Sequence, residues 1–166
     1  MDMLFSPWRS NYINSFKDKK EDCGCVFCEA LKEDAPIENT SLIVRKNKYT
    51  YTMLNLFPYN SGHLMIIPYR HISDFTELNP DETAELMNET GIMIKALTYV
   101  MKPQGFNMGM NIGKAAGAGI DAHLHLHIVP RWIGDTNFMP SIGEVKIISQ
   151  DLLDLRNKLV DALEHI

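Results

Sequence analysis

Apolar and polar positions along the chain predict four or five strands. Each predicted strand is a short apolar, Thr-rich or aromatic run bounded by turn residues. Four of these runs lie at residues 42–45, 49–56, 63–68 and 106–112. A fifth strand is expected where histidine alternates with apolar residues from His123 to Val129, and Pro130 is expected to end it.

Two segments repeat their apolar residues at helical spacing. The first follows Asn79, a candidate N-cap, with Pro80 at the first helical position and Glu82 at the third, and it reaches Met101. The second is expected after a cap at Ser149, with an apolar face of Leu152, Leu153, Leu155, Leu159 and Leu163. Because no helix separates the strands at 42–56 from the strand at 62–68, the pattern favours an α+β fold. We expect an antiparallel sheet of about five strands with two main helices.

Size and composition narrow the functional classes. At 166 residues the chain is expected to form a single domain. Its net charge of -5, without a Lys/Arg cluster, argues against a nucleic-acid polymer as partner, although one small phosphate pocket is compatible with it. No apolar run reaches the roughly 18–20 residues that span a bilayer, and no signal peptide is recognisable, so we expect no membrane association and a cytoplasmic location.

Three histidines at alternate positions are the strongest functional signal. A strand places His123, His125 and His127 on one face, while the apolar residues between them point into the core. Half of the six histidines of the chain lie in this run. Because buried imidazoles cost desolvation that Val or Ile would not, we expect a nucleophilic, acid–base or metal-binding role.

Two further motifs accompany this run. The glycine-rich loop from Gly113 to Gly119 precedes it and would let backbone amides approach an anion, although it is not a P-loop. Cys25 and Cys28 have the spacing of a zinc-binding pair, and the absence of a second cysteine pair would require histidines as the other ligands. An unligated or redox-active pair is the alternative. Candidate partners are His63, His71, His123, His125 and His127, and His63 also fits a hydrogen-bonded core histidine.

The histidine run, followed by Pro130-Arg131-Trp132, resembles the signature of the histidine triad (HIT) superfamily of nucleotide hydrolases and transferases. Residues 55–64 and 105–113 agree with it. The resemblance covers a core at 25–160, preceded by an N-terminal extension at 1–24. Three segments are most similar to the diadenosine tetraphosphate (Ap4A) phosphorylase and HIT-like hydrolase branch: Ser6-Pro7-Trp8-Arg9, residues 55–60 and residues 130–138.

The resemblance implies a HIT-like fold paired across a homodimer, and cleavage of Ap4A-like dinucleoside polyphosphates at the α-phosphate. His125 would be the nucleophile and form a nucleotidyl-histidine, with phosphate or water as acceptor. His127 would donate a hydrogen bond to a phosphate oxygen. The nucleotide-binding residues would be Asn55 at the ribose and Asn111, Gly117 and Gly119 along the phosphates. A nucleoside phosphoramidase (AMP-NH2 or AMP-lysine type) and a non-catalytic purine-nucleotide-binding module are the alternatives.

The resemblance also implies a structural zinc held by Cys25, Cys28, His71 and His123. It implies no organic cofactor, and Mg²⁺ on the substrate is compatible with it. One departure stands out, because Gly119 and Ile120 occupy positions where many members carry Gln followed by Ser or Thr.

Overall fold

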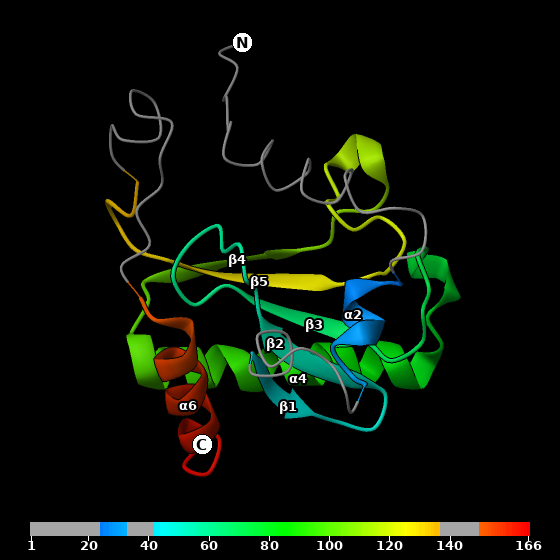
Figure 1. Ribbon diagram of the computed structural model, residues 1–166. Coiled ribbons are helices and arrows are strands. Elements are labelled where there is room, and N and C mark those ends of the chain that lie inside the picture. Colours follow the sequence, from blue (N-terminus) through cyan, green and yellow to red (C-terminus); the bar gives the residue numbers. More distant parts are fainter. Residues whose placement is uncertain (1–23, 33–41, 137–149) are drawn as a thin grey trace.

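The structure, a computed structural model, describes residues 24–32, 42–136 and 150–166. In these ranges five strands form one antiparallel sheet in the order β1-β2-β3-β5-β4 (Figure 1). The strands are β1 (Ile43–Lys46), β2 (Thr50–Leu54), β3 (Leu64–Pro68), β4 (Gly105–Gly109) and β5 (Leu126–Arg131). The expected α+β class and antiparallel sheet are confirmed.

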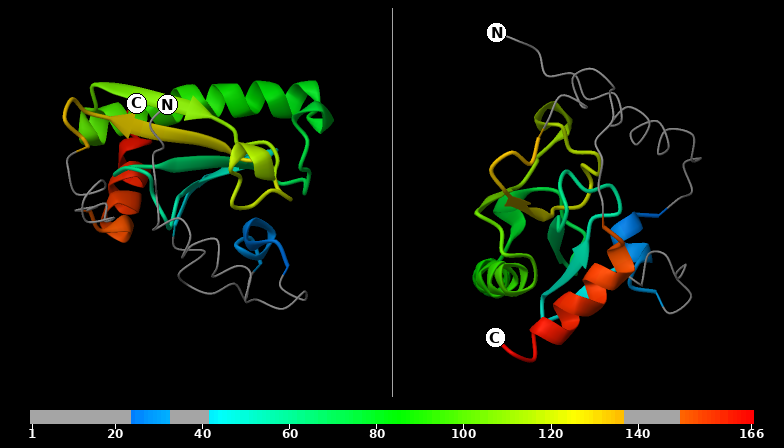
Figure 2. Two further views of the ribbon diagram at one scale, coloured as in Figure 1. Left: turned by 90° about the horizontal axis from the view of Figure 1, so that it is seen from above. Right: turned by 90° about the vertical axis from the view of Figure 1, so that its left-hand side faces the viewer.

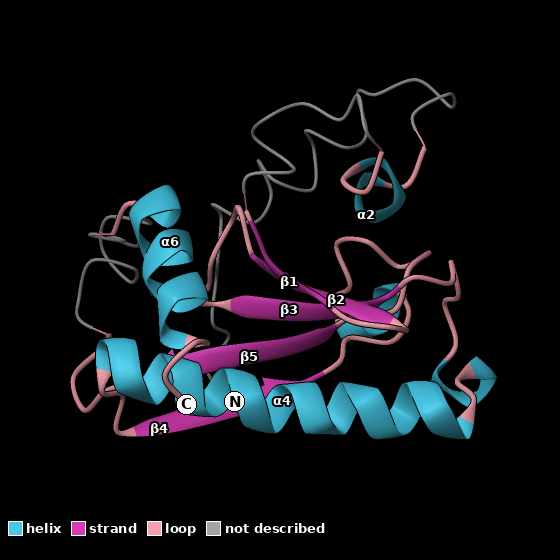
Figure 3. Ribbon diagram, turned by 90° about the horizontal axis from the view of Figure 1, so that it is seen from below, coloured by secondary structure: helices cyan, strands magenta, loops and turns pink. Residues whose placement is uncertain are grey.

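Helices lie on both faces of the sheet. The long helix α4 (Pro80–Met101) covers one face, and the single-turn helix α2 (Val26–Glu29) lies beyond the opposite face (Figure 2). Helix α6 (Leu152–Ala162) packs against α4 and β1 at one end of the sheet (Figure 3). Two 3₁₀ turns, η1 (Phe75–Glu77) and η2 (Lys114–Ala116), lie in connecting loops. No helix in the described part of the chain is long and apolar enough to cross a bilayer.

The long helix begins where its sequence predicts. The Asn79 side chain accepts the backbone N–H of Glu82 at 2.9 Å, and the Glu82 carboxylate accepts the backbone N–H of Asn79 at 2.9 Å. This reciprocal capping box satisfies two amides that would otherwise lack partners. The helix ends at Met101, and Lys102 adopts the left-handed conformation with φ of 49°. Its buried face packs on the sheet through Leu86, Thr90, Met93, Ala96 and Leu97.

The last helix begins differently from the prediction. Asp151, and not Ser149, is its N-cap, because the Asp151 carboxylate accepts the backbone N–H of Asp154 at 2.8 Å. Ser149 itself lies outside the described residues. Leu155 and Leu159 are fully buried, whereas Leu153 is 50 % exposed. The predicted apolar face is therefore correct except at Leu153.

Strand boundaries near the histidines also differ from the prediction. Strand β4 ends at Gly109, so Asn111 lies in the following loop. Strand β5 begins only at Leu126 and continues through Pro130 to Arg131. Proline is tolerated there because β5 pairs with β3 only as far as Ile128, so that Pro130 has a hydrogen-bonded neighbour on one side.

Other expectations lie outside the described residues. The N-terminal extension is described only at Gly24, and the segments at 33–41 and 137–149 are not described. The boundaries of the core at residues 25 and 160 stay predictions.

Candidate active site and metal centre

The three histidines of the alternating run lie on the side of the sheet that faces α2. His123 and His125 belong to the irregular segment that leads into β5, and His127 lies in β5, opposite Met65 of β3. The rings of His125 and His127 are neighbours, with centroids 4.7 Å apart. All three side chains are buried, and so are Leu124 and Leu126 between them and Ile128 after them. The ring contacts of Phe27 with His123 and His125, and of His125 with His127, agree with the predicted shared face, although only one histidine lies in the strand itself.

The backbone determines which nitrogen of His125 carries the proton. His125 Nδ1–H donates to the carbonyl oxygen of His123 at 2.8 Å. A carbonyl only accepts, so a neutral His125 has its lone pair on Nε2. Burial lowers the pKa of His125 from its usual 6.5, and the bond to the His123 carbonyl offsets part of this shift. His125 is thus neutral near pH 7 with Nε2 as its basic atom.

A fourth histidine determines the tautomer of His127. The backbone N–H of Tyr59 donates to His63 Nδ1 at 3.0 Å, so His63 carries its proton on Nε2. His63 Nε2 lies 2.9 Å from His127 Nδ1 and donates to it. His127 Nδ1 is then an acceptor, and its proton must be on Nε2. One backbone amide therefore orients two imidazoles in succession.

Sequence reasoning left His63 between a metal ligand and a core histidine. It is fully buried, and its ring contacts those of Tyr59 and His127 at centroid distances of 4.5 and 5.0 Å. The structure thus brings it to the histidine run and not to the cysteines. Its distance from His127 depends on the register of β3 with β5, which no sequence pattern reveals. The available signal was a histidine at the start of an otherwise apolar strand.

The two neighbouring imidazoles have complementary chemistry. His125 offers a lone pair at Nε2, whereas His127 offers an N–H at Nε2. A nucleophile beside a hydrogen-bond donor is suited to attack on phosphorus, because the donor stabilises charge on a phosphoryl oxygen.

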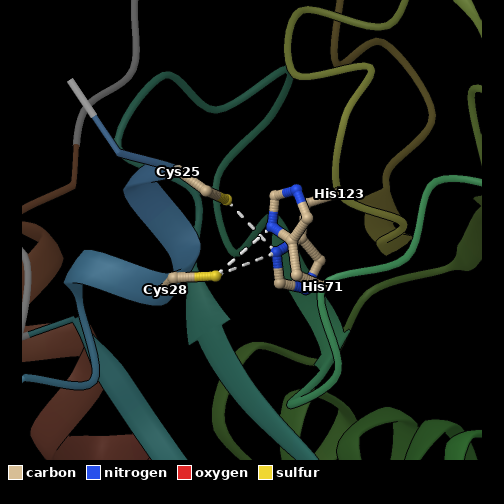
Figure 4. Close-up of side chains that lie close together, drawn as sticks. All are labelled: Cys25, Cys28, His71 and His123. Carbon is tan, nitrogen blue, oxygen red and sulfur yellow. Dashed lines mark hydrogen bonds between the residues drawn. The ribbon is translucent and has the colours of Figure 1, made fainter. Parts of the chain in front are cut away.

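A second cluster joins α2 to the start of the histidine run. Figure 4 shows the thiols of Cys25 and Cys28 directed at the imidazoles of His71 and His123. One ligand atom from each residue lies within 4.8 Å of the other three. Cys25 Sγ is 3.2 Å from His123 Nδ1, and Cys28 Sγ is 3.4 Å from His71 Nδ1 and 3.6 Å from His123 Nδ1. These four predicted residues could hold a metal ion.

The donor set fits a tetrahedral cation such as zinc. Zinc–sulfur and zinc–nitrogen bonds of about 2.3 and 2.0 Å place sulfur and nitrogen about 3.5 Å apart in a tetrahedron. His123 Nε2–H donates to the Pro68 carbonyl at 2.9 Å, which leaves the Nδ1 lone pair directed at the sulfurs. Burial and the adjacent Cys25 raise the pKa of the Cys28 thiol to about 11. A cation bound between the two sulfurs would lower this pKa, because it stabilises the thiolate.

The remaining predicted residues lie around the run. Asn55 follows β2 and is buried; its Oδ1 accepts the backbone N–H of Phe57 at 2.9 Å. The loop before the histidines contains η2 between Gly113 and Gly117, which have φ of 76° and 83°. Both glycines adopt a conformation that L-residues rarely reach. Nucleotide contacts of Asn55, Asn111, Gly117 and Gly119 stay predictions.

Comparison with known proteins identifies the family of this chain. The HIT domain family model matches residues 37–132, which is more than half of the chain. The chain belongs to the HIT family. An AP-4-A phosphorylase of Mycobacterium tuberculosis is 40% identical to this HIT protein over 158 residues, 94% of this chain and 81% of the relative. An adenosine 5'-monophosphoramidase of Saccharomyces cerevisiae is 32% identical over 110 residues, 66% of this chain and 64% of the relative. This HIT protein is therefore an enzyme of a nucleotide hydrolase and transferase family.

Solved structures show the same fold. A Zn-bound histidine triad family protein from Mycobacterium smegmatis has a TM-score of 0.69 and 27% identity, covering 86% of this chain and 94% of that one. A hypothetical histidine triad nucleotide-binding protein from Sulfolobus tokodaii has a TM-score of 0.66 and 26% identity, covering 85% of this chain and 93% of that one. The predicted HIT-like fold is confirmed.

We expect His63→Phe to leave the tautomer of His127 undetermined. The phenylalanine ring fills the space of the imidazole but cannot donate a hydrogen bond to His127 Nδ1. Nitrogen-15 spectra of the imidazoles should then show His127 as a mixture of tautomers, and nucleotide turnover should fall by about 100-fold or more, the range of a lost acid–base partner. His63→Gln retains an N–H donor and should recover part of both. His165→Gln, at the C-terminus, is the control. An unchanged His127 spectrum in His63→Phe would contradict the assignment.

We expect the cluster to bind one Zn²⁺ per chain and to stabilise the fold. At free zinc about 100 times Kd, linkage predicts about 2.7 kcal/mol of added stability, seen as a higher Tm than in chelator. Cys28→Ser should lose both the metal and the shift in Tm. Cys23→Ser alters the third cysteine, to which the family resemblance assigns no role, and should retain both. Equal metal content in the two variants would rule this site out.

Proposed function

We propose that this HIT protein cleaves dinucleoside polyphosphates such as Ap4A at an α-phosphate through a nucleotidyl-histidine. The complementary tautomers of His125 and His127 carry the proposal, because they supply a nucleophile and a donor side by side. The 40% identity to an AP-4-A phosphorylase supports this substrate class.

The chemistry divides into two displacements. His125 Nε2 attacks the α-phosphorus of one AMP unit, a P–N bond forms, and the P–O bond to the departing ATP breaks. The His125 ring then carries positive charge, which the His123 carbonyl stabilises through Nδ1–H. His127 Nε2–H bonds a phosphoryl oxygen as charge builds up on it. An incoming phosphate breaks the P–N bond to give ADP, or water breaks it to give AMP.

Residues around the run would bind the rest of the nucleotide. Asn55, buried beside His63, would contact the ribose. Asn111 and the loop amides of Gly117 and Gly119 would follow the phosphates, with Mg²⁺ on the substrate compatible with this arrangement. Catalytic roles for His123, His125 and His127 belong to the same proposal.

We infer that the metal is a structural zinc held by Cys25, Cys28, His71 and His123. Four protein ligands leave no open position for water, so zinc would brace the polypeptide rather than activate a nucleophile. The Zn-bound relative of known structure supports this choice of ion. A cytoplasmic location stays a prediction from the sequence.

A nucleoside phosphoramidase is the second candidate. The same nucleophile could attack a phosphorus bonded to nitrogen, and the 32% identical yeast relative is an adenosine 5'-monophosphoramidase. A nucleotide-binding module without catalysis is disfavoured, because it would have no need of the two complementary imidazoles.

We expect wild-type protein to convert Ap4A to ATP and ADP only when phosphate is present. AMP and ATP, formed regardless of phosphate, would instead establish a hydrolase, and activity restricted to phosphoramidates would establish the second candidate. His125→Ala should lose turnover by about 10⁴-fold or more while binding AMP, since it removes the attacking atom. Leu153→Ala, at an exposed site on α6, is the control. Near-normal turnover of His125→Ala would overturn the mechanism.

We propose that a second copy of the chain pairs with strand β4. This strand lies at the edge of the sheet, and Met108 on it is 47 % exposed. On α4, Met87 is 52 % exposed and Gly91 has open space around it, so a partner helix could approach closely. Two antiparallel edges related by a two-fold axis would satisfy each other's backbone groups and join the sheets.

We expect sedimentation to give the mass of a dimer for the wild type and that of a monomer for Met108→Asp, because a carboxylate would be buried at the new interface. Leu153→Asp carries the same charge on α6 and should stay dimeric. A monomeric wild-type protein would refute the pairing.

A further inference from the structure

Phe27 lies between the two metal-site cysteines in the sequence and against the proposed nucleophile in space. Its side chain is only 3 % exposed. Its ring centroid is 5.0 Å from that of His125, at an interplanar angle of 56°, and 5.5 Å from that of His123, at 86°. One aromatic ring therefore contacts both a predicted metal ligand and the predicted nucleophile.

The position of Phe27 depends on how α2 is held. Helix α2 has four residues, far fewer than an isolated helix needs for stability in water. Three attachments connect it to the sheet. The Tyr51 hydroxyl donates to the Phe27 carbonyl at 2.8 Å, the Phe27 ring is buried, and the flanking thiols meet His71 and His123. Of these, the thiol cluster is the attachment that a bound metal would convert into covalent-strength bonds.

The ring of His125 has two ring neighbours. Its bond to the His123 carbonyl fixes one nitrogen, but a single hydrogen bond still permits the ring to tilt about it. His127 lies against one part of the ring at a centroid distance of 4.7 Å, and Phe27 lies against another at 5.0 Å. Together these contacts determine where Nε2 points. Attack on phosphorus is sensitive to that direction, since a displacement of about 1 Å can cost about 100-fold in rate.

We propose that Phe27 is a positioning residue for His125, and that metal bound at Cys25, Cys28, His71 and His123 holds Phe27 in place. The proposal rests on the proposed roles of His125 and of the metal cluster. Occupancy of the metal site then sets the rate at which the nucleotidyl-histidine forms, although the metal is remote from the reacting phosphorus. The metal site then affects the rate of catalysis as well as the stability of the fold.

The first test replaces the ring while keeping an apolar side chain. Phe27→Leu should still contain one zinc per chain and bind AMP with wild-type affinity. Its rate of nucleotidyl-His125 formation from Ap4A should fall by about 10- to 100-fold, in line with a misdirected nucleophile. The His125 Nδ1–H resonance should broaden or shift. Leu159→Ala, which removes a fully buried side chain from α6, controls for lower stability and should retain both rate and resonance.

The second test removes the metal. Chelated wild-type protein should show the His125 resonance and the slow adduct formation of Phe27→Leu, and Zn²⁺ should restore both. Chelation should slow Phe27→Leu little further, because both changes act through one contact. Independent, multiplying losses would overturn the proposal by showing that metal acts on His125 through His123 alone. A wild-type rate in Phe27→Leu, or weaker AMP binding without a slower step, would also overturn it.

These outcomes are separate from failure of the proposed function. If wild-type protein forms no adduct with Ap4A, the proposed reaction fails. The His125 resonance still reports whether Phe27 and zinc orient the ring.

Discussion

The hydrogen bond from His125 Nδ1–H to the His123 carbonyl, 2.8 Å long, connects the two centres of this protein. The same residue that accepts this proton on its backbone directs its side-chain Nδ1 at the cysteines. Its Nε2–H is in turn held by the Pro68 carbonyl of β3. A single histidine therefore orients the proposed nucleophile, faces the two cysteines and attaches both to the sheet. Displacing His123 would disturb all three.

Burying four imidazoles on one side of a sheet is expensive unless each proton has an acceptor. Here backbone groups determine where the protons lie: the His123 carbonyl accepts from His125, and the Tyr59 amide donates to His63. The opposite face solves a similar problem with carboxylates. Glu89 is 2 % exposed and accepts the Thr52 hydroxyl at 2.8 Å, which ties α4 to β2. Paired polar groups thus fix geometry on both faces of the sheet, and on one face they include the imidazoles proposed to react.

Local patterns revealed most of the fold and part of the site. Period-two alternation predicted the shared face of the histidines, and the Asn79–Glu82 capping box predicted where α4 begins, because both depend only on neighbours in sequence. The bond between His63 and His127 could not be predicted, since it depends on how β3 aligns with β5. The prediction that Pro130 ends the strand was wrong. The sequence does not show that β5 has no partner on its β3 side at that residue, which is why proline is tolerated there.

The sheet is weakest where β3 meets β5, a junction that we call the seam. Strands β1 to β3 form one meander and β4 with β5 forms a pair, and β3 meets β5 through only three residue pairs, Leu64 with Ile128, Met65 with His127 and Ile66 with Leu126. The contact between His63 and His127 crosses this seam. A local opening of so short a ladder would separate His63 and the Tyr59 amide from His127, while both halves of the sheet kept their own hydrogen bonds. Under the proposed mechanism, such an opening would abolish activity while most of the fold remained intact.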